Sequence, residues 1–323
     1  MTAQLIRLLA DGEIHSGEQL GEQLNITRAG VWKQIKTLTA SGIDIETIGG
    51  RGYRLKNAFE LLDSQQIQCQ LNNHAAHRIT EIETHFELES TNRYLLNQVQ
   101  EGQPFRICLA ERQTQGRGRR GRQWISPLNG NIYLSIHWCF DPAPATLPAL
   151  SLAIGVALAR VTTELGVSNV QLKWPNDLLH QGRKLAGILI EMAGEAQGPC
   201  HLVIGVGYNL NSHQQLAEVD QAVTALSELS QTLPNRNAIA AMLINALSEA
   251  LITFESEGFA PFIESWNQYD FLHNRPVRLS QADQHIHGVA KGVHTDGALI
   301  LDRDGKLEYH RAGEASLRLA DAC

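Results

Sequence analysis

The spacing of apolar residues changes twice along the chain, and these changes constrain the fold more than any single motif. The spacing is helical up to about residue 60, mixed from residue 62, and strand-like with Asp-Gly turns from residue 271. We therefore predict an α+β protein of three domains, comprising residues 1–61, 62–270 and 271–323. A chain of 323 residues is long enough for each domain to bury a core of its own.

The N-terminal domain has the pattern of a winged helix-turn-helix. Two short amphipathic helices are expected over residues 3–24, followed by a tight turn and a third helix. In the third helix Val31, Ile35 and Leu38 fall on one face, as packing on a core requires. Apolar residues then alternate around three glycines, which indicates a β-hairpin wing.

Basic and acidic residues in the first 60 positions are equal in number but lie in different parts of the segment. These residues carry seven Lys or Arg and seven Asp or Glu, yet no acid occurs between Thr27 and Ile43. Basic residues on the third helix and the wing are what phosphate contacts beside a major-groove helix require. We therefore expect DNA binding, with a winged helix that contacts protein as the alternative. The candidate DNA contacts are Thr27, Arg28, Trp32, Lys33, Lys36 and Arg51.

The overall charge and the cysteines limit the partners and the compartment. The formal net charge of −7 argues against nucleic-acid binding over the whole surface, so any such contact must be local. The five cysteines are odd in number and lack CxxC spacing, which favours the reducing cytoplasm over a disulfide framework or a zinc site. The longest apolar run, residues 147–161, is shorter than the roughly 20 residues of a membrane span. It predicts a buried helix and no membrane partner.

The middle of the chain predicts helices packed on a sheet. Strands are expected over residues 106–113, 130–140 and 184–192, the last of them following a hairpin turn at Gln181-Gly182, and long helices over residues 147–165 and 236–257. The short strands of the last domain predict a small antiparallel barrel of SH3-like size.

Five arginines and three glycines occupy the eleven residues from Arg112 to Arg122, which we call the Arg/Gly stretch. Glycines between the arginines let the backbone wrap closely and expose its N–H groups, while guanidinium groups pair with carboxylate and phosphate. The stretch has neither the GxxxxGK[ST] phosphate loop nor the strand-turn-helix context of a dinucleotide motif. A cradle for a small anionic ligand explains the composition best, and a nucleic-acid patch and a solvated loop are the alternatives.

Small polar residues also stand where a helix is expected to begin. Ser90, Thr91 and Asn92 follow one another, and a helix cap is enough to explain them. The functional alternative is that this helix start presents polar groups to a ligand.

Two lysines at strand ends are harder to explain without an anion. Lys173 precedes a Pro-Asn-Asp turn, and Lys184 begins a strand. The glycines and asparagines of GVGYNLN, residues 205–211, suit either the close approach of a ligand or an ordinary bulge. HExxH and GxSxG are absent from the sequence, which disfavours zinc hydrolysis and serine-type acyl transfer.

Together, these motifs resemble the biotin–protein ligase family. The motifs are Ser90-Thr91-Asn92, QTQGRGRRGRQW, LKWPNDLL followed by GRKLAGILIE, and GVGYNLN. With a winged helix before them, the chain is similar nearly end to end to the bifunctional members, which are ligases and biotin operon repressors. Such members form biotinyl-5′-AMP from biotin and ATP. They then pass the biotinyl group to one lysine of the biotin carboxyl carrier protein of acetyl-CoA carboxylase.

The resemblance implies a class II synthetase-like ligase domain and a role for each motif. It implies biotin contacts from Ser90, Thr91, Asn92, Gln113, Arg117, Gly118, Arg119 and Lys184. It implies nucleotide contacts from Arg119, Arg120, Arg122, Trp124, Lys173, Asn176, Asp177 and Asn209. Lys184, Arg119 and Arg117 would be catalytic by neutralising charge, and Mg²⁺ would arrive with ATP, with Asp177 as a candidate ligand.

The resemblance also implies regulation. Biotinyl-5′-AMP would promote a homodimer that binds a two-fold operator of the biotin operon, while the Arg/Gly stretch and residues 212–224 would fold over the adenylate. A lipoate-type ligase, a ligand-sensing repressor without ligase activity and a ligase whose winged helix no longer binds DNA are the alternatives. The Arg/Gly stretch favours biotin over lipoate.

Overall fold

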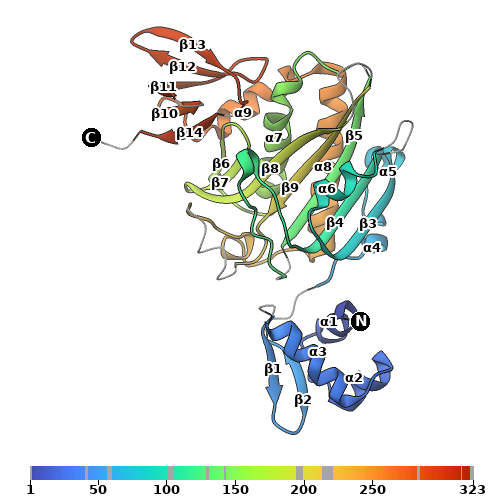
Figure 1. Cartoon of the computed structure of the whole chain (residues 1–323). Helices are drawn as coiled ribbons and strands as arrows, with labels where there is room; N and C mark the ends of the chain where they lie inside the picture. The colour runs from blue at the N-terminus through green and yellow to red at the C-terminus, as the bar shows by residue number, and fades with distance from the viewer. Residues whose placement is uncertain are drawn as a thin grey trace.

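The fold comprises a small helical unit, a central sheet with helices, and a small all-strand unit, in chain order (Figure 1). The computed structural model describes residues 2–40, 43–56, 60–99, 105–128, 131–141, 143–193, 199–212, 221–281, 284–313 and 315–320.

The N-terminal unit is a winged helix-turn-helix. Its elements are α1 (Thr2–Leu9), α2 (Gly17–Leu24), α3 (Arg28–Ala40), β1 (Ile45–Ile48) and β2 (Gly52–Leu55). The N–H of Gln19 donates to Ser16 Oγ and the N–H of Ser16 donates to Gln19 Oε1, a capping box that starts α2. The predicted core face of α3, Val31, Ile35 and Leu38, is buried.

This unit packs against the rest of the chain through a few apolar side chains. Leu61, Phe86 and Leu128 are partly buried against its core. Phe86 belongs to the first strand of the central sheet, and Leu128 follows the Arg/Gly stretch. The winged helix therefore rests on the end of the sheet near the predicted ligand loop.

A seven-stranded mixed sheet with the order β3-β4-β5-β9-β8-β7-β6 forms the centre of the molecule. Its strands are β3 (Ile79–Leu88), β4 (Phe105–Gln113), β5 (Ile132–Phe140), β6 (Val170–Lys173), β7 (Asp177–His180), β8 (Arg183–Ala193) and β9 (Cys200–Tyr208). β3 and β4 are parallel, and the other pairs are antiparallel. Gln181 and Gly182, with φ of 49° and 76°, make the predicted turn between β7 and β8.

Helices cover the two faces of this sheet unequally (Figure 1). The helices are α4 (Ser64–Gln68), α5 (Asn73–Arg78), α6 (Thr91–Leu96), α7 (Leu150–Glu164), α8 (Arg236–Glu257) and α9 (Ile263–Tyr269). α7 and α8 pack together on the main core, which includes Trp138 and Tyr208. Only the short α6 lies on the opposite face among the described residues, so much of that face is open to a ligand.

The first of the long apolar helices differs from its prediction. Residues 147–149 form a 3₁₀ turn with Pro148 at its start, and α7 begins only at Leu150. By length and composition, Leu147–Glu164 and Arg236–Glu257 could each cross a membrane, so the expectation that the first is too short for a span is wrong. Their burial instead marks them as core helices, since 67% and 61% of the most apolar 18 residues of each are buried inside the fold.

The C-terminal unit is the predicted small antiparallel structure. Its strands are β10 (Pro276–Gln281), β11 (Gln284–Val293), β12 (Leu299–Arg303), β13 (Lys306–His310) and β14 (Ser316–Leu319), in the order β13-β12-β11-β10-β14. Asp304 and Gly305, with φ of 53° and 83°, make the turn between β12 and β13. Val277, Leu279 and Leu301 join the main core, which fixes this unit against the central sheet.

Candidate functional site

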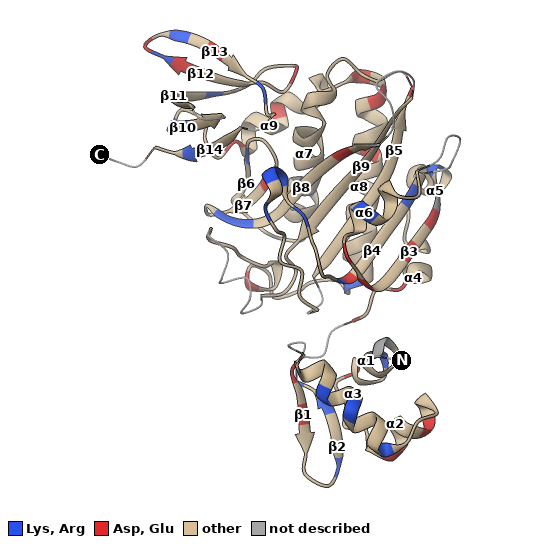
Figure 2. Ribbon diagram, in the orientation of Figure 1, with Lys and Arg blue, Asp and Glu red and all other residues tan. Residues whose placement is uncertain are grey.

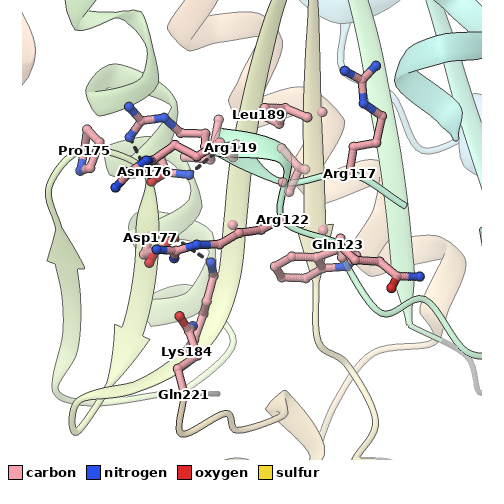
Figure 3. A pocket seen from close by; sticks show the side chains of 18 of the residues that line it. Arg117, Arg119, Arg122, Gln123, Pro175, Asn176, Asp177, Lys184, Leu189 and Gln221 are labelled. Carbon is pink, nitrogen blue, oxygen red and sulfur yellow. Dashed lines mark hydrogen bonds and ion pairs between the residues drawn. The ribbon is translucent and has the colours of Figure 1, made fainter. Parts of the chain in front are cut away.

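A cavity of about 670 Å³ lies on the open face of the sheet. This volume is within the range of small-molecule sites. The start of α6, the Arg/Gly stretch, the β6–β7 turn, β8, β9 and the start of β14 all contribute side chains to it. Figure 3 shows those of the Arg/Gly stretch, the β6–β7 turn and β8 from close by. Every residue predicted to contact biotin or nucleotide lines this one cavity, so the structure brings the dispersed motifs together.

The start of α6 supplies a group of buried polar side chains. Ser90 is the N-cap, with its hydroxyl accepting from the Arg93 N–H, so the cap interpretation is correct. Both the N–H and the hydroxyl of Thr91 donate to Gln113 Oε1, at 2.9 and 3.1 Å. Ser90, Thr91 and Asn92 are each 4% exposed and still reach the cavity. The cap and the ligand interpretation are therefore compatible.

Glu191 ties this polar group to the Arg/Gly stretch. Asn92 Nδ2 donates to Glu191 Oε2 at 2.9 Å, and Arg117 Nη1 lies 3.0 Å from Glu191 Oε1. Ser135 Oγ donates to Asn92 Oδ1 at 2.6 Å. Sequence reasoning assigned no role to Glu191 or Ser135. The signal for Glu191 was a single acid at the end of the apolar run LAGILIE.

The glycines of GVGYN leave room for two side chains of the same protein. A Cβ on Gly205 would lie 2.2 Å from Asn92 Oδ1, and one on Gly207 would lie 2.3 Å from Trp124 Cε2. The pairing of β8 with β9 is continuous across both glycines, so the bulge interpretation is wrong. The Trp124 indole occupies the space that a side chain at Gly207 would fill. The indole thereby forms one wall of the cavity.

Opposite charges meet at the other end of the cavity. Lys184 Nζ lies 2.7 Å from Asp177 Oδ1 and 5.2 Å from the centre of the Trp124 ring. Figure 3 shows Arg122 extending toward this pair, while Arg117 points to the opposite end of the cavity. Burial lowers the pKa of Lys173, and the nearby Lys184 lowers it further against the opposing effect of Asp177. This end of the cavity is therefore an electropositive site with one carboxylate.

Arg119 connects three separate segments. Its Nη2 donates to the backbone carbonyls of Ala312 and Gly313, at 2.9 and 2.6 Å, and its Nη1 donates to Asn176 Oδ1 at 3.5 Å. Burial lowers the pKa of Arg119, and the Asp177 carboxylate opposes that shift. Arg119 was predicted to be a ligand contact and a catalytic group. The structure adds that its guanidinium also holds the loop against the C-terminal unit.

Asn209 has a local structural function. Its Nδ2 donates to the carbonyls of Lys184 and Thr224, at 3.3 and 3.2 Å, and the residue is 2% exposed. It therefore fixes the backbone of Lys184, although it also lines the cavity. Of the predicted closing segment 212–224, residues 213–220 lie outside the described residues.

The described residues contain no group of three or more His, Cys, Asp or Glu side chains that could hold a metal ion. Mg²⁺ commonly binds through one or two carboxylates together with substrate phosphates. Asp177 is the only acidic side chain among the described residues lining the cavity. It fits a magnesium ion that a nucleotide brings with it.

The predicted DNA contacts lie together on the winged helix, outside this cavity. Thr27 Oγ1 accepts from the Gly30 N–H and so caps α3. Figure 2 shows basic residues on α3 and β2 and acidic residues on β1. Two basic residues of the wing are paired with acids, since Arg54 contacts Glu46 at 2.6 Å and Lys56 lies 3.9 Å from Asp44. Arg28, Trp32, Lys33, Lys36 and Arg51 are exposed.

Comparison with known families finds three matches along the chain. Residues 86–209 match the biotin/lipoate A/B protein ligase family, residues 2–54 match an HTH domain, and residues 272–318 match the biotin protein ligase C-terminal domain.

Curated relatives and solved structures extend this result. The bifunctional ligase/repressor BirA of Escherichia coli is 44% identical over 98% of this chain and 97% of its own length. The biotin–[acetyl-CoA-carboxylase] ligase of Mycobacterium tuberculosis is 34% identical over 70% of this chain and 84% of its own length. The Aquifex aeolicus biotin protein ligase, solved with biotin and ATP, covers 75% of this chain and all of its own, with a TM-score of 0.62 and 27% identity. The chain therefore belongs to the biotin protein ligase family and resembles its bifunctional ligase/repressors over its full length.

Proposed function

We propose that the chain is an ATP-dependent biotin–protein ligase that also represses transcription through its winged helix. One observation carries the ligase assignment: a single cavity joins a buried polar end, around Thr91 and Asn92, to an electropositive end, around Lys184. A neutral ring that carries a carboxylate tail fits the polar end, and a nucleotide fits the electropositive end. The relatives named as biotin ligases support the identity of the ring.

We assign biotin to the polar end. Its ureido group would exchange hydrogen bonds with Ser90, Thr91, Asn92 and Gln113, with Arg117 and Gly118 closing over it. Because these groups are buried, an analogue that lacks a matching donor or acceptor would leave them unpaired, which is a strong source of specificity. The carboxylate would then point along the wall made by Trp124 toward Lys184.

The first step is attack by the biotin carboxylate on the α-phosphorus of ATP. An oxygen–phosphorus bond forms, the bond to the β-phosphate breaks, and pyrophosphate leaves. An ionised carboxylate needs no general base, so the protein contributes positioning and charge neutralisation. We assign this to Lys184, Arg117 and Arg119 as catalytic groups. The further nucleotide contacts are Arg120, Arg122, Trp124, Lys173, Asn176, Asp177 and Asn209.

The second step transfers the biotinyl group. The neutral amine of an acceptor lysine attacks the acyl carbon of biotinyl-5′-AMP, an amide bond forms, and AMP leaves as the amine loses its proton. We propose the biotin carboxyl carrier protein of acetyl-CoA carboxylase as the acceptor. The adenylate must be shielded from water until then, which suits a cavity covered by the Arg/Gly stretch.

For repression, we propose that biotinyl-5′-AMP promotes a homodimer that binds the biotin operon operator through Thr27, Arg28, Trp32, Lys33, Lys36 and Arg51. Ligand binding and dimer formation would then raise each other's affinity. We assign residues 1–61 to the DNA-binding domain, 62–270 to the ligase domain and 271–323 to the C-terminal domain. The cytoplasm, where both the acceptor and the operator occur, is the proposed location.

Exchange of labelled pyrophosphate into ATP tests the ligase assignment. Biotin should support exchange and lipoate should not. Exchange with lipoate alone would decide for a lipoate-type ligase, and exchange with neither would leave only a ligand-sensing repressor. A mobility-shift assay on the biotin operon promoter, with and without biotin plus ATP, tests the repressor half. If no shift occurs under either condition, the proposed repressor function is wrong.

A further inference from the structure

Trp32 on α3 is a large apolar side chain left exposed beside basic residues. It is 55% exposed, and no other large apolar side chain described in the winged helix is as exposed. Val31 and Ile35, its neighbours on α3, are buried at 0% and 6% exposure. The indole therefore points away from the core of this unit.

Trp32 lies in a continuous outer stripe of the helix. Ala29, Trp32, Lys33 and Lys36 have the spacing i, i+3, i+4 and i+7, which places them on one face, and all four are exposed. The centre of the stripe is apolar and its flank is basic. A surface that binds an apolar protein partner does not require two lysines and the absence of acidic residues. A surface that binds a groove of a nucleic acid does.

Lys36 is held over the indole. Its Nζ lies 5.2 Å from the centre of the Trp32 ring, a cation–π contact one helical turn away. Trp32 nevertheless remains 55% exposed, so much of its surface is free for a further contact. Trp32 therefore presents an apolar edge and at the same time restrains a phosphate-binding cation.

We propose that Trp32, with Ala29, reads the C5-methyl groups of thymines in the major groove. The inference rests on the proposed DNA binding and adds to it the base that this face recognises. Major-groove edges offer hydrogen-bonding groups for every base but a methyl group only for thymine, and apolar side chains are what contact it. Lys33 and Lys36 would contact phosphate and contribute affinity without sequence information.

A cycle of protein and DNA changes tests this proposal. A duplex is first enriched from a random library by the full-length protein with biotin and ATP. Each thymine is then replaced in turn by deoxyuridine, which removes only the methyl group. At contacted positions the wild type should bind about fourfold more weakly, the loss expected for one buried methyl group. Trp32→Ala should bind thymine and uracil duplexes equally at the positions that Trp32 reads.

Lys33→Ala provides the matched control on the same helix face. It should weaken binding to all duplexes and reduce the salt dependence, while the preference for thymine over uracil remains. Pyrophosphate exchange by Trp32→Ala should match the wild type, which verifies that the ligase domain is folded, and its remaining affinity for the thymine duplex verifies that the winged helix is folded. If the wild type enriches no duplex, the proposed DNA binding itself fails. If it enriches one but is insensitive to uracil at every position, or if Trp32→Ala keeps the sensitivity, the assignment of Trp32 is wrong.

Discussion

Arg236 Nη1 lies 2.6 Å from Glu111 Oε2, and both side chains are only 4% exposed. The same nitrogen donates to the Glu60 carbonyl at 2.8 Å, and the other carboxylate oxygen of Glu111 accepts from the Leu62 N–H at 2.6 Å. Arg236 also donates to the carbonyl of Asn131. This ion pair therefore joins the start of α8, the end of β4 and the segment that leads from the winged helix into the central sheet.

Removing one member of this pair should destabilise the protein strongly. Arg236→Met leaves the Glu111 carboxylate buried without its partner, so the free energy of unfolding should fall by about 3–5 kcal/mol. Arg303→Met, which breaks the more exposed pair with Glu308, should cost far less, because water screens an exposed ion pair. Urea unfolding of both variants checks this. Equal losses in the free energy of unfolding would mean that the buried Arg236–Glu111 pair contributes no more to stability than an exposed pair does.

Loss of the Lys184 ammonium should impair the first chemical step. Lys184→Ala should slow biotin-dependent pyrophosphate exchange by about a hundredfold to a thousandfold, because a preorganised charge is lost where negative charge develops. Its partner Asp177 would also be left without its 2.7 Å contact, so thermal unfolding is measured alongside exchange. A folded Lys184→Ala variant with unchanged exchange would show that the catalytic role is misassigned.

A methyl group on Gly207 should displace Trp124. The new Cβ would lie 2.3 Å from the indole, so Gly207→Ala should raise the KM for biotin and cost about 1–3 kcal/mol of stability. Gly49→Ala, in the wing, is the control because a Cβ there has nothing within 4 Å. Steady-state exchange and tryptophan fluorescence report the two effects. If Gly207→Ala behaves like the control, Trp124 does not form the wall of the biotin site.

Lys173 should favour ligand binding at the expense of stability. Its pKa is lowered because it is buried, so the folded state binds its proton less tightly than the unfolded state does. Lys173→Met should therefore raise the free energy of unfolding without ATP, by roughly 0.5–2 kcal/mol, and weaken ATP binding. The stability difference between variant and wild type should shrink as pH rises toward the ordinary lysine value of 10.5, because the folded wild type loses the unfavourable charge first. A stability difference that grows over this pH range would contradict the lowered pKa of Lys173.

Local sequence patterns predicted the elements well, but they could not reveal partners far apart in the chain. Val31, Ile35 and Leu38 identified the buried face of α3, and Gln181-Gly182 identified the turn before β8. By contrast, the carbonyls of Ala312 and Gly313 that bind Arg119 are nearly two hundred residues away and leave no trace in its motif. Glycine spacing indicated a close approach at β9, but not that Asn92 and Trp124 make it.

Transfer of biotin to the acceptor is the direct measure of ligase activity. The purified chain is incubated with biotin, ATP and the apo biotin carboxyl carrier protein, and the intact mass of the acceptor is measured, with lipoate replacing biotin in a parallel reaction. We expect one biotinyl group on one lysine of the acceptor and no change with lipoate. An acceptor left unmodified by biotin, or modified by lipoate instead, would contradict the proposed ligase function.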